Sequence, residues 1–313
     1  MSLLAWSPDG KVLAAVDSYA KGDKKQGIIK FWQTDTLRPS QLDLPQWQIV
    51  LDNAYFYQFD WYNNKEFVVR QGNNGIKEFA IWHVDSLSQI DVLYRYPPDR
   101  TNTFRLFSPD FSNAADFKSS EPSSIQLTNS QSLKLDYPFI TTLAWSDDST
   151  RLIVANKKTM SGSHHVEGAI NVFDVSTAKL LHRIKSHFPI LDIEISANKQ
   201  FIATAGFRET DDRVDGAITV FDLETEKPAL NLRSYIAKST LAWHPEKQQL
   251  AIGFNNTLEI IDFPLKERPR LTPSNQNLRA IAWHPEGKML ATSHRKSAYS
   301  KKTIFMIVPT GEK

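Results

Sequence analysis

Residues 240–263, TLAWHPEKQQLAIGFNNTLEIIDF, alternate short apolar segments with polar turns. The apolar segments cover residues 241–243, 249–254 and 257–262, and the turns between them contain His-Pro-Glu and Asn-Asn. Alternating apolar and β-branched residues are typical of strands, and Asn-Asn favours the positive φ angles of a two-residue hairpin turn. The pattern therefore predicts three short antiparallel strands, which need neighbours of the same kind to bury both faces.

The same pattern recurs along the whole chain. Near-copies are LLAWSPDGKVLAAV from residue 3, TLAWSDDSTRLIVA from residue 142 and AIAWHPEGKMLATS from residue 280. Weaker copies start at residues 58, 105 and 192. Seven repeats in 313 residues give about 45 residues each. Aligning them places one large apolar side chain at the end of each first strand: Trp6, Trp61, Phe107, Trp145, Ile195, Trp243 and Trp283.

Most repeats continue with a third strand of one type, such as GAINVFDVST from residue 168 and GAITVFDLET from residue 216. Together these segments resemble the WD40 repeat family over nearly the whole chain, and the SPDG-type turn also resembles TolB-like propeller repeats. The resemblance implies an all-β, seven-bladed β-propeller in a single domain spanning residues 1–313. It also implies a non-catalytic scaffold that binds other proteins.

The sequence departs from the WD40 pattern at its polar positions. The Gly-His pair before the first strand appears only as Ser186-His187, and the terminal Trp-Asp pair is weakened to pairs such as Trp32-Gln33 and Phe173-Asp174. The buried hydrogen bonds of regular WD40 blades are therefore not expected here. We predict that apolar packing between neighbouring sheets holds the blades together.

The third repeat and the end of the chain deviate most. Residues 102–137 are rich in serine and fit either a degenerate third blade or a linker; the blade is favoured because a linker would leave Trp61 and Trp145 84 positions apart with no anchor between them. The chain finishes shortly after Val308, so the last blade is expected to lack its outer strand. Either flanking residues of a larger multidomain chain or a partner peptide would then supply that strand.

Composition narrows the function classes. Apolar residues make up 41% of the chain, enough for a core, and the formal net charge of +2 gives no reason to expect nucleic acid or a membrane surface. The absence of cysteine excludes disulfides and thiolate metal sites. We expect a soluble protein. The sequence determines neither its oligomeric state nor its compartment, although the cytoplasm is slightly favoured.

The segments between second and third strands vary most in length. They are long at residues 17–27, 156–168, 206–216 and 293–302. A blade needs only a tight turn there, and long loops on a rigid scaffold are common recognition sites. We therefore predict that the face carrying these loops binds the partner.

Basic residues gather in the first and last of these loops, which ring closure would make neighbours. The predicted partner-binding residues are Lys21, Lys24, Lys25, Arg295, Lys296, Tyr299, Lys301 and Lys302. A basic sector would favour an acidic protein or peptide. The alternative interpretation is that these are solvated loops whose charges only maintain solubility.

Candidates for chemistry are sparse, and no cofactor or metal is expected. His164-His165 with Glu167 lacks a third ligand at a diagnostic spacing, and the acidic segment 211–215 lacks the ligand pattern of an EF-hand loop. Among the innermost strands only Asp60, Asp192 and Glu194 are acidic. The alternative function is a propeller enzyme, or a metal-dependent site in the central channel where these acids converge with a histidine.

The repeat alignment generates one stability prediction. Trp145→Ala and Trp243→Ala should each lower the free energy of unfolding by roughly 3 to 5 kcal/mol, the usual cost of deleting a large buried aromatic side chain. Thermal or urea unfolding of the two variants measures this cost. Wild-type melting curves for both would contradict the anchor assignment.

Overall fold

The computed structural model describes residues 2–21, 24–36, 45–52, 54–73, 76–96, 103–118, 124–159, 166–209, 214–234, 239–254, 257–265, 277–295 and 303–309. These residues form seven antiparallel sheets and one short 3-10 helix, η1 (Thr34–Thr36). None of the helical residues described could form a segment long and apolar enough to cross a membrane. Contacts divide the chain into two compact units, which are described separately.

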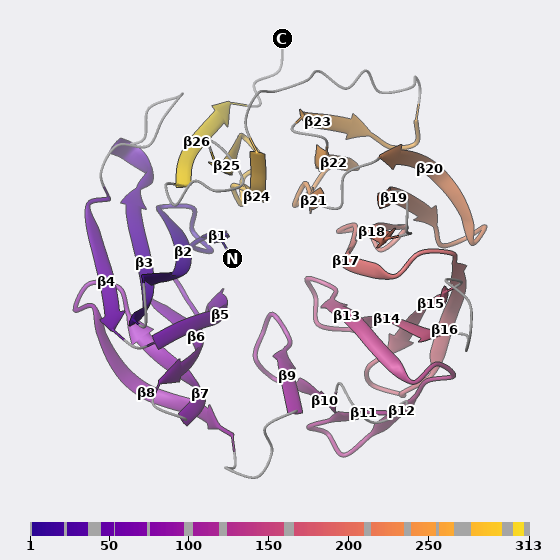
Figure 1. Ribbon diagram of the computed structural model, residues 1–313, viewed down its shortest axis with the longest axis horizontal. Coiled ribbons are helices and arrows are strands. Elements are labelled where there is room, and N and C mark those ends of the chain that lie inside the picture. Colours follow the sequence, from indigo (N-terminus) through magenta and orange to yellow (C-terminus); the bar gives the residue numbers. More distant parts are fainter. Residues whose placement is uncertain are drawn as a thin grey trace. The chain divides into compact units, whose positions relative to one another are not determined.

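Unit 1 comprises Met1–Thr101 and Asn275–Lys313. It contains two four-stranded sheets and one three-stranded sheet in the described residues (Figure 1). The first sheet is β1 (Ser2–Trp6), β2 (Val12–Lys21), β3 (Lys24–Gln33) and β4 (Trp47–Asp52). The second is β5 (Ala54–Trp61), β6 (Glu66–Asn73), β7 (Ile76–His83) and β8 (Ser88–Arg95). The last sheet of the chain is β24 (Asn277–Trp283), β25 (Met289–Arg295) and β26 (Thr303–Pro309).

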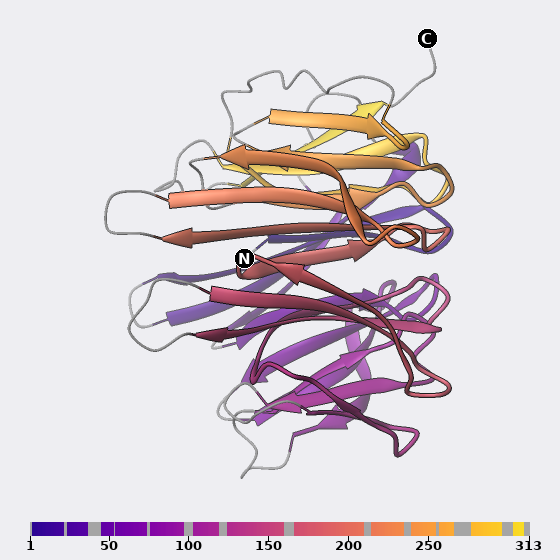
Figure 2. The same cartoon turned by 90° about the vertical axis from the view of Figure 1, so that its right-hand side faces the viewer.

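Unit 2 comprises Asn102–Ser274. Its four sheets follow the order of the sequence, and their strands run from magenta to orange in Figure 2. The third sheet is β9 (Thr103–Phe107), β10 (Ala114–Lys118), β11 (Ser124–Leu127) and β12 (Ser132–Lys134). The fourth is β13 (Phe139–Trp145), β14 (Arg151–Thr159), β15 (Val166–Asp174) and β16 (Leu180–Ser186). The fifth is β17 (Ile190–Ile195), β18 (Phe201–Glu209), β19 (Val214–Asp222) and β20 (Lys227–Ser234), and the sixth is β21 (Ser239–Trp243), β22 (Gln249–Phe254) and β23 (Thr257–Asp262).

Every predicted anchor is the last residue of the first strand of its sheet. The residue after the anchor builds the turn that ends the strand. In the first sheet Ser7 Oγ donates to Asp9 Oδ1 at 2.8 Å and accepts the Val12 N–H at 2.9 Å. In the last sheet His284 takes the place of serine, and its Nδ1 accepts the Glu286 N–H at 3.1 Å. The Ser-Pro-Asp and His-Pro-Glu sequences therefore form the same kind of turn, in which a serine oxygen or a histidine nitrogen accepts a backbone N–H.

Apolar side chains fill the space between neighbouring sheets within each unit. In unit 1 Phe31 of the first sheet packs against Phe67 of the second, with ring centroids 5.3 Å apart. In unit 2 Trp243 of the sixth sheet stacks on Phe201 of the fifth, with ring centroids 6.2 Å apart. Burial of such aromatic pairs is a large stabilising contribution to a sheet-on-sheet interface.

Three anchor tryptophans also bridge neighbouring sheets by a hydrogen bond. Each donates its Nε1–H to the backbone oxygen of the residue before the anchor in the preceding sheet. The bonds are Trp6 to Ala282 at 3.1 Å, Trp61 to Ala5 at 3.3 Å and Trp145 to Leu106 at 3.3 Å. Trp243 differs, because its buried Nε1 has no hydrogen-bond partner within the described structure.

Buried hydrogen bonds, which the sequence did not lead us to expect, do occur within individual sheets. In the second sheet the buried Glu78 carboxylate accepts from Gln71 Nε2 and from Arg95 Nε, each at 3.0 Å. In the fourth sheet Asn171 Nδ2 donates to Asn156 Oδ1 at 2.9 Å, and both residues are buried. These bonds run across the strands of single sheets and satisfy polar groups that would otherwise be costly to bury.

The predicted loops are partly strand. β2 and β3 pair as far as Lys21 and Lys24, and β18 and β19 pair as far as Glu209 and Val214, so the chain continues as hairpins beyond the expected strand ends. Cross-strand pairing needs only backbone groups, so the ladder extends through polar residues that weaken the sequence signal. Within the range predicted as a degenerate third blade, β9 to β12 form a four-stranded sheet. The sixth sheet, like the last, shows three strands in the described residues, where the sequence predicted this for the last alone.

The difference between Trp145 and Trp243 gives a paired prediction. Both Trp→Phe variants remove the indole, but only Trp145→Phe also breaks a hydrogen bond and leaves the Leu106 oxygen without that donor. Trp145→Phe should therefore cost about 1 kcal/mol more than Trp243→Phe in the free energy of unfolding. Urea titration of the two variants measures the difference. An equal loss in both would show that the Trp145 bond contributes no net stability.

Candidate functional site

The predicted partner-binding residues lie on two hairpins of unit 1. Lys21 ends β2, while Lys24 and Lys25 open β3, so these lysines flank one hairpin tip. Arg295 ends β25, at the base of the second hairpin. The side chains of these four residues lie outside the described structure, as do Lys296, Tyr299, Lys301 and Lys302.

The two hairpins belong to neighbouring sheets and lie at the same end of them. Trp6, the last residue of β1, bonds Ala282 near the end of β24, so these two strands finish side by side. The first residues, Ser2 and Asn277, pair with Asp17 and Arg295. Both hairpin tips are therefore at the opposite end, where β1 and β24 begin.

The junction between these two sheets is closely fitted. His284 is buried and lies edge-on to Trp6, with ring centroids 4.9 Å apart. Its Nε2 lies 3.0 Å from the Gly10 carbonyl oxygen, which can only accept, so this nitrogen carries the hydrogen. Gly10 has φ +68, and a Cβ there would come within 2.2 Å of His284 Nε2. Glycine is therefore required at residue 10 both for the turn and for the approach of the last sheet.

Asp17 lies away from the tip of the first hairpin. The segment 17–27 carries Asp17 and Asp23 beside its lysines, but Asp17 lies within β2, pairs with Ile28 and is 8% exposed. Lys21 and Lys24, which pair with each other at the end of the ladder, are therefore nearer to the tip than this carboxylate.

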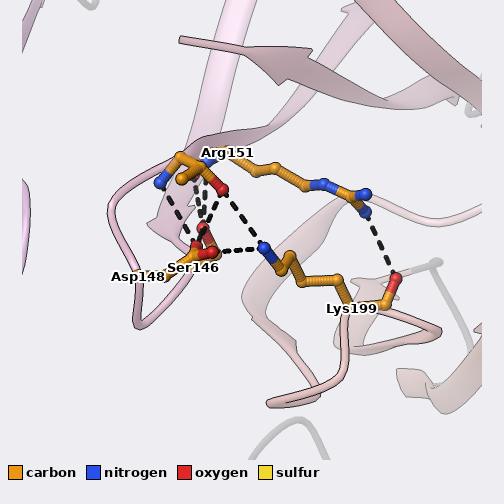
Figure 3. Close-up of polar contacts among 5 residues, drawn as sticks. Ser146, Asp148, Arg151 and Lys199 are labelled. Atoms are coloured by element: carbon orange, nitrogen blue, oxygen red, sulfur yellow. Dashed lines mark hydrogen bonds and ion pairs between the residues drawn. The ribbon is translucent and has the colours of Figure 1, made fainter. Parts of the chain in front are cut away.

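At the other end of the sheets, turns of neighbouring sheets are bonded to each other. In unit 1 the Asp9 N–H donates to Asn64 Oδ1 at 3.0 Å, and in unit 2 the Asp110 N–H donates to Ser149 Oγ at 3.2 Å. Figure 3 shows the link between the fourth and fifth sheets, where Lys199 Nζ pairs with the Asp148 carboxylate. These bonds hold the turn end of each unit, whereas the hairpin tips are at the opposite end.

The same link shifts the pKa of Asp148. Burial would raise this pKa, but hydrogen bonds from Lys199, Ser146 and Thr150 outweigh it and hold the pKa of the carboxyl well below its usual range. Arg151 strengthens the link, because its Nη1 donates to the Lys199 oxygen at 3.3 Å (Figure 3). The adjacent Asp147 shows the opposite behaviour: burial and the charge of Asp148 raise its pKa.

The acidic residues of the innermost strands fall in different units. Asp60 lies on β5 of unit 1, where Gln58 Nε2 donates to its Oδ2 at 2.7 Å, and loss of hydration raises the pKa of Asp60 to about 6. Asp192 and Glu194 lie on β17 of unit 2. Burial raises the pKa of Asp192 to about 6, and burial together with the neighbouring Asp192 raises the pKa of Glu194 well above its usual range.

The structure does not assemble a metal site in its described part. No group of three or more potential ligands is close enough there to hold an ion. Glu167 is engaged otherwise, with Lys158 Nζ 2.8 Å from its Oε2 and the Tyr137 hydroxyl donating to it at 3.2 Å. His164, His165, Asp211 and Asp212 lie outside the described residues, as does the side chain of Asp215.

Sequence reasoning missed one contact of these acids. Glu194 Oε2 accepts the backbone N–H of Trp243 at 3.1 Å, which links the fifth and sixth sheets. The available signal was the repeat alignment, in which Glu194 occupies the place that Ala5, Ala144, Ala242 and Ala282 hold in other repeats.

No protein-family model and no curated protein matches the sequence. Many solved structures resemble the fold, and two of them illustrate the extent of the likeness. Kuenenia stuttgartiensis hydrazine synthase contains a chain with a TM-score of 0.65 and 13% identity, covering 99% of this chain and 96% of that one. A chain of the mitotic checkpoint complex has a TM-score of 0.59 and 16% identity, covering 99% of this chain and 90% of that one. These likenesses show the fold, an all-β β-propeller.

Asp147 and Asp148 give a prediction with opposite signs. Asp148 has a lowered folded-state pKa, so its carboxylate stabilises the fold above the unfolded-state value of about 3.9, and this contribution is lost as the pH falls. Asp148→Asn should therefore lower the melting temperature at pH 7, with a smaller effect at pH 3. Asp147 has a raised pKa, so Asp147→Asn should leave the melting temperature at pH 7 unchanged or raise it.

Melting curves of both variants at the two pH values measure this contrast. A loss of similar size in both variants at pH 7 would contradict the roles assigned to the two carboxylates.

Proposed function

We propose that this chain is a non-catalytic interaction module, a WD40-like propeller that binds an acidic protein or peptide through the hairpin tips of its first and last sheets. The observation that carries the proposal is the placement of Lys21, Lys24 and Arg295 on adjacent sheets of unit 1, at one end. The remaining basic residues of the surface follow Arg295 in the sequence.

The opposite ends of the sheets support this choice of face. Their turns donate and accept hydrogen bonds among themselves, as Asp9 does with Asn64 and Asp148 with Lys199. Groups used in this way are less available to a partner. The hairpin tips differ from one sheet to the next in length and charge, and such variation on a rigid scaffold fits recognition.

We propose further that the seven sheets of the described residues correspond to seven blades, with the sheet of β9 to β12 as the third. β26 is the outermost described strand of the last sheet, so its outer edge can accept a fourth strand. That strand would come from flanking residues of a larger chain or from a partner peptide.

The comparisons support an interaction role only through the fold. One structural neighbour belongs to a protein assembly, the mitotic checkpoint complex, and the other to hydrazine synthase. A propeller hosts both binding and catalysis, so the choice rests on the surface residues rather than on either neighbour.

Charge reversal tests the proposed surface. A short fluorescent poly-glutamate peptide serves as the acidic probe, and fluorescence anisotropy reports its binding. Lys296→Glu with Lys301→Glu should weaken binding about tenfold, a loss of about 1.4 kcal/mol, and higher salt should weaken wild-type binding as well.

Lys227→Glu with Lys266→Glu is the matched control, because it changes the net charge equally at residues outside the two basic segments. An equal loss in both double variants would attribute binding to net charge rather than to this surface. Unchanged binding in the first double variant would refute the proposed surface.

A further inference from the structure

Two carboxylates of the fifth sheet cap backbone groups of the sixth. Asp192 and Glu194 are alternate residues of β17, so they project from the same side of the strand. Ile193 and Ile195 project from the other side and pack in the core with the fourth sheet. Glu194 Oε2 accepts the N–H of Trp243 at 3.1 Å, and the backbone N–H of Leu241 faces the Asp192 carboxyl, where it acts to lower the pKa of that group.

The capped N–H groups point away from their own sheet. The His244 N–H donates to the Gln249 oxygen of β22 at 2.8 Å. Since consecutive N–H groups of a strand alternate in direction, the N–H of Trp243 points away from β22, and so does that of Leu241. β17 and β21 belong to different sheets and are not paired through their backbones. The two carboxyl groups therefore face N–H groups of β21 that would otherwise bond the carbonyl oxygens of a neighbouring strand.

The strands β21 and β13 and the paired residues of β18 bring no positive charge to this pair. β21 carries no ionisable side chain in its sequence STLAW, and β13, the innermost strand of the fourth sheet, carries none in FITTLAW. On β18 the residues paired with Asp192 and Glu194 are Ala205 and Ala203. The turn after β13 adds Asp147, whose charge acts on Glu194, while the nearby Lys199 pairs with Asp148 instead.

The second repeat offers a comparison within the same chain. At the positions that Asp192 and Glu194 occupy, it carries Gln58 and Asp60, and the amide donates to the carboxylate at 2.7 Å. An amide in place of one carboxyl removes the repulsion between like charges. The fifth sheet therefore carries two carboxyl groups at these positions, whereas the second sheet carries one carboxyl group and one amide.

We propose that Asp192 and Glu194 form a proton-controlled latch between β17 and β21, closed while the pair retains a proton and loosened when both carboxyls are ionised. A protonated carboxyl still accepts an N–H through its carbonyl oxygen, so protonation keeps the caps in place. Ionisation strengthens each hydrogen bond from a backbone N–H to a carboxylate. It also places two negative charges, with Asp147 beside them, in the half-buried contact between β17 and β21. Burial and repulsion outweigh the bonds to the backbone.

The direction of the pH effect follows from the raised pKa values of both groups. A carboxyl whose pKa is higher in the folded than in the unfolded protein stabilises the fold at low pH and loses this contribution as the pH rises through its folded-state value. Between pH 5.5 and pH 8 the shift of Asp192 to about 6 should by itself raise the unfolding equilibrium constant about fourfold. Glu194 adds to this change.

Urea unfolding of the full chain at pH 5.5 and pH 8 tests the latch. Asp192→Asn and Glu194→Gln keep an acceptor for the N–H, and each should reduce the pH dependence and make the protein more stable than wild type at pH 8. Glu224→Gln, an exposed acid of the same sheet, is the control and should retain the wild-type pH dependence. The proposal is overturned if Asp192→Asn and Glu194→Gln both retain the wild-type pH dependence of unfolding.

Amide hydrogen exchange locates the effect. After correction for the base-catalysed intrinsic rate, protection of the Leu241 and Trp243 amides should fall several-fold between pH 5.5 and pH 8 in the wild type and stay constant in Glu194→Gln. The Ile252 amide on β22 is the internal reference. Protection at Leu241 and Trp243 that follows the Ile252 amide at both pH values would show that the seam does not open, and would refute the latch.

Discussion

The structure depends on contact between the faces of neighbouring sheets. A sheet of three or four short strands cannot bury both of its faces, so each one needs a neighbour on either side. The large side chain that ends each first strand supplies much of this contact, and in three sheets its indole also bonds the preceding sheet. The repeat is conspicuous in the sequence because every sheet must meet this same requirement.

The same requirement explains what could be predicted from the sequence. The anchors from Trp6 to Trp283 recur because burial selects large apolar residues, and the structure ends a strand at each of them. Polar contacts gave a weaker signal. Serine and histidine fill the same turn at Ser7 and His284 through different atoms, and the bonds between Gln71 and Glu78 use residues that no other repeat shares.

The candidate surface was only partly accessible to sequence reasoning. Charge counting located the basic segments, and the repeat alignment made their sheets neighbours. A charge count of the segment 17–27 includes Asp17, but backbone pairing carries β2 past this residue, and its side chain is buried. The repeat alignment marked Glu194 as unusual but could not identify Trp243 as its partner, because a side chain that bonds a backbone N–H leaves no preference for the residue type of that partner. Such contacts need coordinates.

The junction of the first and last sheets has a consequence for biosynthesis. Leu13, Ala15 and Trp32 of the first sheet share a core cluster with Ala291 of the last. Ala291 follows these side chains by more than 250 residues in the sequence, so they leave the ribosome well before the residue that covers them. Until the last sheet has been synthesised, this apolar surface is exposed on the nascent chain, where it favours aggregation.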